Sequence, residues 1–250
     1  MLTDQVVVVV GMGEVGRPLR KILSTSYECI AVDLTPVDVK ERCLALHICY
    51  PFQISDFISI SVSYILKYRP ELVIINSTVA PGTTRAVQSL VPDIPVTYSP
   101  VRGKHARMEA DMRRYKKFVS GFTVGATNAA AQHFRSAGLK TDVFRTPEIA
   151  EVSKLLETTY LGMLVAWAQE MERIARRYDG SAEEVSAFTE EIDFLPSNIF
   201  PGHIGGHCVM PNITILQAHV QSPFLDAITE SNRIKGIECE RKGLEERSIR

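Results

Sequence analysis

Residues 6–16 read Val6-Val7-Val8-Val9-Val10-Gly11-Met12-Gly13-Glu14-Val15-Gly16, and this stretch decides the fold. The run of valines predicts a strand buried on both faces, as a parallel sheet requires. The three glycines allow a tight turn, the approach of a pyrophosphate to the backbone, and close packing of helix on strand. A helix expected from Glu14 to Ser26 directs its N-terminal amides at that phosphate. The stretch therefore predicts a dinucleotide site.

An acidic residue follows the second strand-like run at the distance that such a site requires. The run ends at Asp33, about 20 residues beyond the glycines. A carboxylate there accepts hydrogen bonds from the ribose hydroxyls and repels a 2′-phosphate, so the sequence favours NAD over NADP. The alternative is a simple glycine turn with a solvated aspartate. The residues that we expect to bind the cofactor are Gly11, Met12, Gly13, Glu14, Val15, Gly16, Asp33, Tyr50, Pro51 and Thr78.

The composition is that of a globular chain of 250 residues, 45% of them apolar, with a net charge of −1. Acidic and basic residues are interspersed, which argues against nucleic-acid binding, and we expect Arg113-Arg114 and Lys116-Lys117 on a solvated face. No apolar run reaches membrane-spanning length, and no charged leader precedes an apolar signal core. We therefore expect a cytoplasmic protein that makes no membrane contact.

The five cysteines are widely spaced and include no CxxC pair, which favours a reducing compartment over a disulfide framework. Cys29, Cys43 and Cys49 lie in or beside apolar runs, so we expect them to be buried small hydrophobic residues. No second Cys/His pair accompanies His203, His207 and Cys208 at zinc spacing, and the other histidines form no constellation. We expect no metal site.

Alternating strand-like and helical segments predict an α/β fold with a doubly wound parallel sheet of the Rossmann type over residues 1–146. Only residues 34–43 separate the second strand from the third. The sheet is therefore trimmed at one edge: strand 28–33 should be an edge strand, and strand 44–49 should lie on the other side of strand 5–10. The strand-like runs are 5–10, 28–33, 44–49, 72–76, 95–98, 117–120 and 140–144, with helices near 53–68, 81–91 and 127–137.

Residues 147–250 predict a smaller all-helical domain with a long central helix. Thr146-Pro147-Glu148 reads as a helix start, and the pattern continues to about Tyr178. Ser181 and Glu184 then predict a capping box, and residues 213–219 and 224–247 are again helical. The long helix carries more apolar side chains than one sheet domain can cover. We therefore expect the protein to form a homodimer through this helix. Its apolar stripe is Ile149, Val152, Leu155, Leu156, Met163, Leu164, Trp167, Met171 and Ile174.

Two further segments carry residues suited to chemistry. Residues 76–84 follow a buried strand, and because ligands of open parallel sheets bind at the carboxyl ends of strands, Thr78 should face the nicotinamide. Residues 200–208 form a glycine-rich loop ending at Cys208, and glycines beside a thiol suit close approach to a ligand. The alternatives are an ordinary capped turn for the first segment and a buried thiol for the second.

These motifs occur in the same order in the nucleotide-sugar 6-dehydrogenases, the UDP-glucose and GDP-mannose dehydrogenases, which the chain resembles over nearly its whole length. The resemblance implies NAD-dependent oxidation of a sugar C6 alcohol to a carboxylate in two hydride transfers. It also implies that the family's C-terminal domain, which helps bind the nucleotide, is missing. The matching motifs are Gly11-x-Gly13-x-Val15-Gly16-x-Pro18-Leu19, Ser77 to Thr84, Ser99-Pro100, Ala150-Glu151-x-x-Lys154 and Pro201-Gly202-x-x-Gly205-Gly206-His207-Cys208.

The resemblance implies a role for each matching residue. Cys208 is the nucleophile that captures the aldehyde, Lys154 stabilises developing oxyanion charge, and Thr78 positions water and substrate. Two candidate catalytic positions depart from the family: Thr158 replaces an asparagine, and Asn212 replaces an aspartate. Asn212 cannot take a proton.

A third departure lies after the fifth strand. The glutamate that commonly follows Ser-Pro in the family is Val101 here, and a cationic cluster comes next. This cluster is expected either to hold a small anionic substrate, such as a sugar derivative, or to be solvated. Its members are Arg102, Lys104, His105 and Arg107.

Three functions remain open from the sequence. The first is a nucleotide-sugar dehydrogenase with a thioester step at Cys208. The second is a dehydrogenase of the 3-hydroxyacid type that transfers a single hydride with the help of Lys154. The third is a non-catalytic NAD-binding or assembly protein with a decayed site. The retained glycines, Thr78, Lys154 and Cys208 favour the first two. Asn212, Val101 and the missing C-terminal domain favour the third.

Overall fold

The computed structural model describes residues 4–33, 35, 37–193 and 195–248. It divides into two compact units, Met1–Lys154 and Leu155–Arg250. The helix that the sequence places at the start of the second domain contributes its first turns to the first unit. None of the helices in the described residues combines the length and apolar character that crossing a membrane requires.

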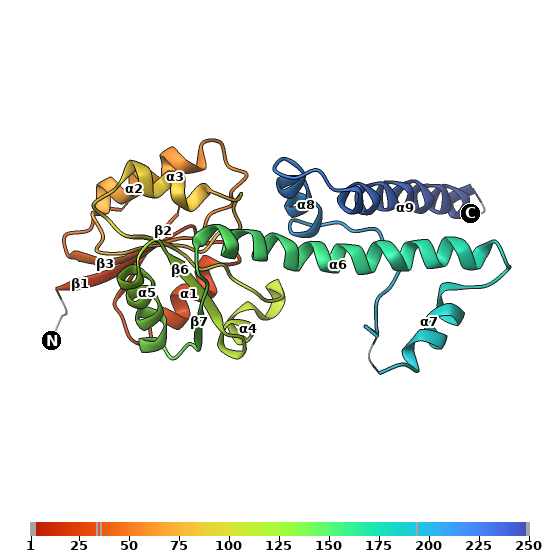
Figure 1. The fold of residues 1–250 in the computed structure, drawn as a ribbon, viewed down its shortest axis with the longest axis horizontal. Coiled ribbons are helices and arrows are strands. Elements are labelled where there is room, and N and C mark those ends of the chain that lie inside the picture. The colour runs from red at the N-terminus through yellow and green to blue at the C-terminus, as the bar shows by residue number, and fades with distance from the viewer. Residues whose placement is uncertain (1–3, 34, 36, 194, 249–250) are drawn as a thin grey trace. The chain divides into compact units, whose positions relative to one another are not determined.

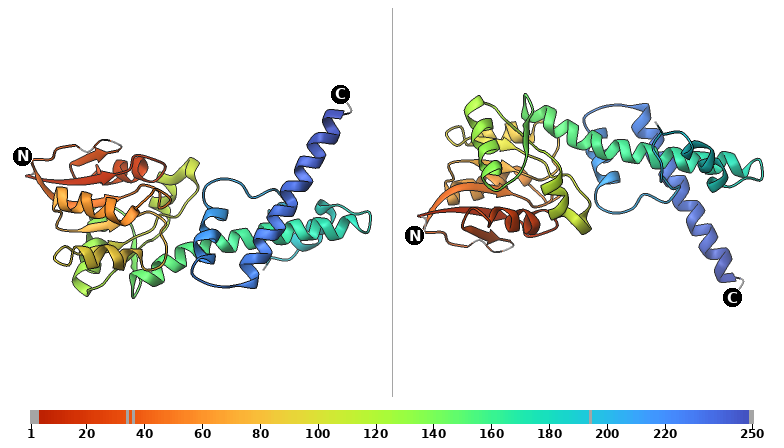
Figure 2. Two further views of the ribbon diagram at one scale, coloured as in Figure 1. Left: turned by 90° about the horizontal axis from the view of Figure 1, so that it is seen from above. Right: turned by 90° about the horizontal axis from the view of Figure 1, so that it is seen from below.

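The first unit is built on one sheet with helices on both faces (Figure 1, Figure 2). Its strand order is β2-β1-β3-β4-β5-β6-β7. As predicted, β2 lies at the edge, and β3 pairs with the other side of β1. All the predicted strand-like runs are confirmed as strands: β1 (Gln5–Val10), β2 (Cys29–Val32), β3 (Arg42–Ile48), β4 (Val73–Ile75), β5 (Val96–Tyr98), β6 (Lys117–Gly121) and β7 (Thr141–Val143).

The sheet departs from the predicted parallel arrangement at β6. This strand runs antiparallel to β5, with Thr97 opposite Gly121, and β7 is again parallel to β6. A parallel pair needs a crossover that returns the chain to the starting edge of the sheet. Residues 99–116, which form the 3₁₀ turn η1 (His105–Arg107) and helix α4 (Met108–Arg114), enter β6 at the edge where β5 ends. The strand is therefore traversed in the opposite direction.

The valines of β1 divide the core into two layers because successive side chains of a strand point to opposite faces. Val6, Val8 and Val10 belong to a buried cluster that includes residues of α2 and α3. Val7 and Val9 belong to a second cluster, shared with α1, α4 and α5. These helices are α1 (Gly16–Leu23), α2 (Phe57–Tyr68), α3 (Thr83–Leu90) and α5 (Val124–Ser136). The doubly wound architecture is thus confirmed.

The second unit is all helical. Helix α6 (Pro147–Arg176) begins at the predicted proline, and the Thr146 hydroxyl accepts a hydrogen bond from the Ile149 amide at 3.4 Å. Helix α7 (Ala182–Glu190) has the predicted capping box between Ser181 and Glu184. Helices α8 (Val209–Gln217) and α9 (Pro223–Ser248) complete the unit. Helix α8 begins earlier than predicted because its proline, Pro211, lies in the first turn, where no amide hydrogen is needed.

Leu155 is the one residue of the predicted stripe that is buried on α6. Trp167 and Ile174 are 60% and 43% exposed, whereas the buried positions alternate by three and four residues. Most of these positions carry small or polar side chains, which allow α8 to approach closely. A Cβ atom on Gly162 would lie 2.9 Å from Val209 Cγ1. The buried residues along this face are Leu155, Thr159, Gly162, Ala166 and Gln169.

Candidate functional site

The loop after β1 has the geometry that its glycines predict. Gly11 adopts a φ of 92°, and a Cβ there would lie 2.6 Å from the Tyr50 amide nitrogen. A Cβ on Gly16 would lie 1.8 Å from the Gly11 carbonyl oxygen. A Cβ on Gly13, by contrast, would meet nothing within 4 Å. Two glycines therefore serve close packing, and the third leaves the backbone open to a ligand.

Asp33 lies at the end of β2, beside this loop. Its Oδ1 atom accepts a hydrogen bond from the Met12 amide at 3.3 Å, and its side chain is exposed. The carboxylate thus retains an accessible oxygen next to the open backbone at Gly13. These residues fit the pyrophosphate and ribose of a dinucleotide.

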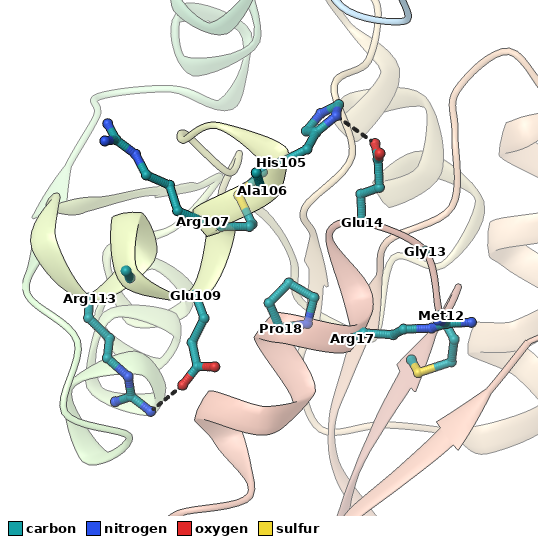
Figure 3. A pocket seen from close by; sticks show the side chains of 12 residues that line it. Met12, Gly13, Glu14, Arg17, Pro18, His105, Ala106, Arg107, Glu109 and Arg113 are labelled. Carbon is teal, nitrogen blue, oxygen red and sulfur yellow. Dashed lines mark hydrogen bonds and ion pairs between the residues drawn. The ribbon is translucent and has the colours of Figure 1, made fainter.

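A cavity of about 770 Å³ lies beside the loop (Figure 3). Its size is within the range of small-molecule sites. Met12, Gly13 and Glu14 line one part, together with Arg17 and Pro18 of α1, and η1 and α4 line the other. His105 Nδ1 and Glu14 Oε2 point toward each other across it and lie 2.8 Å apart.

The two arginines of the predicted cationic cluster are also engaged within the first unit. The Arg102 guanidinium donates to the Lys116 carbonyl at 2.7 Å and lies 4.8 Å from the Phe118 ring. Arg107 Nε donates to Asp111 Oδ2 at 3.0 Å, and the same carboxylate oxygen accepts a hydrogen bond from the backbone amide of Lys104. These contacts hold the segment after β5 in place.

Lys117 contradicts the expectation of a solvated face. It is 4% exposed, and its ammonium donates hydrogen bonds to the carbonyls of Ser99 and Pro100. Burial lowers the pKa of this lysine to about 7. The reason is the antiparallel pairing of β6, which places the first residue of this strand beside the Ser99-Pro100 turn at the end of β5.

The Thr78 loop is anchored on both sides. The Ser77 hydroxyl donates to the Tyr50 carbonyl at 2.6 Å, and Thr78 itself is half-buried. The Tyr50 side chain lies in the core, where its hydroxyl is 2.6 Å from that of Ser61, so only its backbone is available at this edge. Pro51 is exposed.

The end of the same loop is held by Glu151 of α6. Its carboxylate accepts hydrogen bonds from the Gly82 amide at 2.7 Å, the Thr84 amide at 2.8 Å and the Thr84 hydroxyl at 2.6 Å. Glu151 is fully buried. It therefore supplies the acceptor that the N-terminus of α3 lacks within its own sequence.

The structure also pairs two histidines that sequence reasoning left without partners. The Nε2 atoms of His47 and His133 lie 2.9 Å apart, and the Asn76 amide nitrogen lies 3.1 Å from His47 Nδ1. Because that amide donates to His47 Nδ1, the His47 proton is on Nε2 and His133 Nε2 accepts it. Burial lowers the pKa of both histidines, that of His133 to about 4. No sequence spacing indicated this pair, since the contact joins residues on β3 and α5.

Cys208 is half-buried and immediately precedes α8. The Cys208 carbonyl accepts a hydrogen bond from the backbone amide of Asn212 at 3.1 Å. The Asn212 side chain is 4% exposed and donates to the Thr158 hydroxyl at 3.0 Å. The two residues that depart from the expected catalytic pattern are thus in direct contact, and this contact joins α8 to α6.

The remaining candidates are distributed over the two units. Thr78 and the half-buried Lys154 belong to the first, and Cys208, Thr158 and Asn212 belong to the second. Burial raises the pKa of the Cys43 and Cys49 thiols to about 12, as suits inert core residues. Cys29, which we expected to be buried, is half-buried. Within the described residues, no cluster of His, Cys, Asp or Glu is suited to hold a metal ion.

Comparisons with known proteins agree with the motifs. Residues 148–233 match the model of the UDP-glucose/GDP-mannose dehydrogenase family, central domain. A curated relative, UDP-N-acetyl-D-mannosamine dehydrogenase of Pyrococcus horikoshii, is 26% identical over 166 residues. That sequence match covers 62% of this chain and 40% of the relative.

Solved structures show the same fold. The UDP-D-ManNAc dehydrogenase of Pyrococcus horikoshii superimposes with a TM-score of 0.79 at 19% identity, covering 93% of this chain and 68% of that one. The 3-hydroxyisobutyrate dehydrogenase of Mycobacterium tuberculosis superimposes with a TM-score of 0.69 at 11% identity, covering 96% and 94%. The predicted resemblance is therefore confirmed: this chain is similar to the nucleotide-sugar dehydrogenases in sequence and fold, and residues 148–233 match the central domain of their family.

Proposed function

We propose that this chain is an NAD-dependent oxidoreductase of the nucleotide-sugar 6-dehydrogenase type, acting on a primary alcohol of a sugar derivative. The similarity to nucleotide-sugar dehydrogenases supports a dehydrogenase. The observation that carries the choice of cofactor is the loop after β1, where Gly13 is open and Asp33 is bonded to the Met12 amide. NAD, when bound, supplies the hydride acceptor.

The residues of the chain have distinct proposed roles. The Asp33 carboxylate accepts hydrogen bonds from the ribose hydroxyls, and the backbone amides of Gly13 and Glu14 bind the pyrophosphate. Lys154 stabilises negative charge that develops on the substrate oxygen. Thr78 orients the substrate at the end of β4. The Cys208 sulfur adds to the aldehyde carbon while the thiol proton passes to the carbonyl oxygen, and this covalent bond holds the aldehyde for a second oxidation.

A second candidate is a dehydrogenase that stops after one hydride transfer. The Asn212 amide donates to the Thr158 hydroxyl, and an amide cannot accept the thiol proton as a carboxylate does. The likeness to 3-hydroxyisobutyrate dehydrogenase along almost the whole of both chains agrees with this candidate at the level of fold.

Counting NADH formed per substrate consumed separates these functions. The substrates should include UDP-N-acetyl-D-mannosamine, UDP-glucose, GDP-mannose and 3-hydroxy acids. Two NADH for each substrate support the first function, and one NADH with aldehyde as product supports the second. NAD binding without reduction by any tested alcohol supports the third function, a non-catalytic NAD-binding or assembly protein. Cys208→Ser should abolish only the second oxidation, whereas Lys154→Ala should slow both.

The cofactor choice has its own test. Asp33→Ala should weaken NAD binding by about 1–3 kcal/mol, because it removes hydrogen bonds to the ribose. NADP should bind the native protein more weakly than NAD, since its 2′-phosphate would face the Asp33 carboxylate. Equal affinities of the native protein for both cofactors in calorimetry would exclude this role.

A further inference from the structure

The loop that leads to Cys208 has little packing of its own. Between Pro201 and His207 only Ile204 is buried, and Gly206 adopts a φ of 80°. A glycine-rich segment loses much conformational entropy when it adopts one conformation. Contacts from outside the segment must therefore hold this backbone in place.

Two buried side-chain amides from neighbouring helices make these contacts. Asn232 of α9, 5% exposed, accepts the Ile204 amide at 2.7 Å and donates to the Ile204 carbonyl at 3.0 Å. Gln169 of α6, fully buried, donates to the Gly202 carbonyl at 2.8 Å. The Ser231 hydroxyl donates to Gln169 Oε1 at 2.8 Å and so fixes the orientation of the Gln169 amide. We call Asn232 and Gln169 the amide clamp.

The clamp is specific for one loop conformation because Asn232 binds both the amide and the carbonyl of Ile204, while Gln169 donates to the Gly202 carbonyl. The two clamp residues also contact each other, since Gln169 donates to Asn232 Oδ1 at 3.4 Å. A buried amide that loses its partners costs free energy, so the unclamped loop is disfavoured. On the other side of Cys208, α8 is held by the Asn212–Thr158 hydrogen bond and by close packing on Gly162. The thiol thus lies between two fixed segments.

We infer that Asn232 and Gln169 are positioning residues for Cys208, acting on the thiol through the backbone of Gly202 and Ile204. This inference rests on the proposed role of Cys208 as the nucleophile. Neither side chain takes part in the chemistry. Their effect is to keep the sulfur in the single position from which it reaches the substrate carbon.

Asn232→Asp tests the clamp because it keeps the acceptor for the Ile204 amide but loses the donor to the Ile204 carbonyl. At about pH 8 the amide hydrogens of residues 202–207 should exchange about tenfold faster than in the native protein, as the loss of one hydrogen bond predicts. The rate of the Cys208-dependent second oxidation should fall by a similar factor, while the KM for NAD stays unchanged.

Acidification should reverse both effects in this variant. Burial and the facing Ile204 carbonyl raise the pKa of the introduced carboxyl. The Ile204 and Gln169 amides that donate to Oδ1, and Arg173, which reaches Ser231, act in the opposite direction. Once protonated, the carboxyl again donates to Ile204. The exchange rate and the turnover rate of the variant, each divided by the native value at the same pH, should therefore return toward 1 as the pH is lowered from about 8 to about 5. A merely destabilised variant would not recover.

Thr229→Ala on the same helix is the matched control, since its hydroxyl donates only within α9, to the Leu225 carbonyl. It should leave exchange in the loop and turnover unchanged.

If Asn232→Asp does not fold, Gln169→Glu replaces it, because this change removes the donor to the Gly202 carbonyl. Native loop exchange in the folded variant would overturn the inference. A different outcome would refute the proposed function and not the clamp. In that case the variant shows faster loop exchange, but the native protein shows no oxidation that depends on Cys208.

Discussion

Glu151 is the residue on which the Thr78 loop depends most directly. A single buried carboxylate accepts three hydrogen bonds from Gly82 and Thr84, at the start of α3. Burial raises the pKa of this carboxyl, and the three donors act in the opposite direction. Its place in the motif Ala150-Glu151-x-x-Lys154 thus has a structural reason: it ties the helix that carries Lys154 to the loop that carries Thr78.

Glu151→Ala should therefore destabilise the first unit by about 3 kcal/mol, because it leaves three buried donors without an acceptor. The measurement is the free energy of unfolding in urea. Glu148→Ala is the matched control one turn away, since Glu148 forms an exposed ion pair with Arg85 that contributes about 1 kcal/mol or less. Equal losses for the two variants would contradict the capping role.

The buried histidine pair makes the stability of the first unit depend on pH. In the folded state the pKa of His133 is lowered from 6.5 to about 4, whereas the unfolded chain takes up the proton near 6.5. The stability that the neutral His133 ring contributes to the folded state is therefore fully present above pH 6.5, and it is lost as the pH falls from 6.5 toward 4. For His133 alone the loss is about 3 kcal/mol, at roughly 1.4 kcal/mol for each tenfold change in proton affinity, and His47 adds to it.

Urea unfolding at a series of pH values checks this expectation. His133→Gln, which retains a donor and an acceptor without a titrating ring, should have a shallower decline over the same range. An unchanged slope in this variant would show that other groups cause the acid sensitivity.

At the scale of elements, the contact between α6 and α8 depends on a glycine. Alanine normally favours a helix over glycine by about 1 kcal/mol. On Gly162, however, a methyl group would lie 2.9 Å from Val209 Cγ1 and 3.2 Å from Ile213 Cδ1. The Val209 side chain in the first turn of α8 would have to shift, and Cys208 directly precedes Val209.

Gly162→Ala should lower the thermal midpoint of the protein by the equivalent of about 1–3 kcal/mol, since overpacking outweighs the gain in helix propensity. Gly125→Ala in α5 is the control. The added methyl would there be 4.0 Å from the closest neighbouring atom, Thr123 Oγ1, so this variant should be as stable as the native protein or more so. A stabilised Gly162→Ala variant would mean that α8 is not packed closely on α6.

At the scale of the whole molecule, α6 leaves large apolar side chains uncovered. Leu156, Tyr160, Leu161 and Trp167 are each between 46% and 60% exposed. Large aromatic and aliphatic side chains of this kind are typical of the centre of protein interfaces. We propose that a second copy of the chain covers them and that the protein is a homodimer.

The mass in solution at micromolar concentration should be that of two chains, measured by light scattering or sedimentation. Trp167→Lys should produce monomers, because it places a charge in the proposed interface. Leu66→Lys, at a residue of α2 that is 60% exposed, should leave the dimer intact. A native protein that is monomeric throughout this concentration range would contradict the proposal.

The sequence alone determined the strands, the long helix and the glycine loop after β1, because each depends on local patterns. A run of valines, glycines at fixed spacing, and Thr-Pro-Glu at a helix start specify their conformations whatever lies around them. The short interval after β2 also sufficed to predict the order β2-β1-β3, since a right-handed crossover leaves few alternatives.

Only the tertiary structure decided which long-range partners these elements acquire. The antiparallel turn into β6 buries Lys117 against Ser99 and Pro100, and His47 meets His133 across 86 residues of sequence. The amide clamp at Ile204 likewise joins residues 28 positions apart. Such contacts follow from where packing brings a side chain, and no local spacing encodes that position.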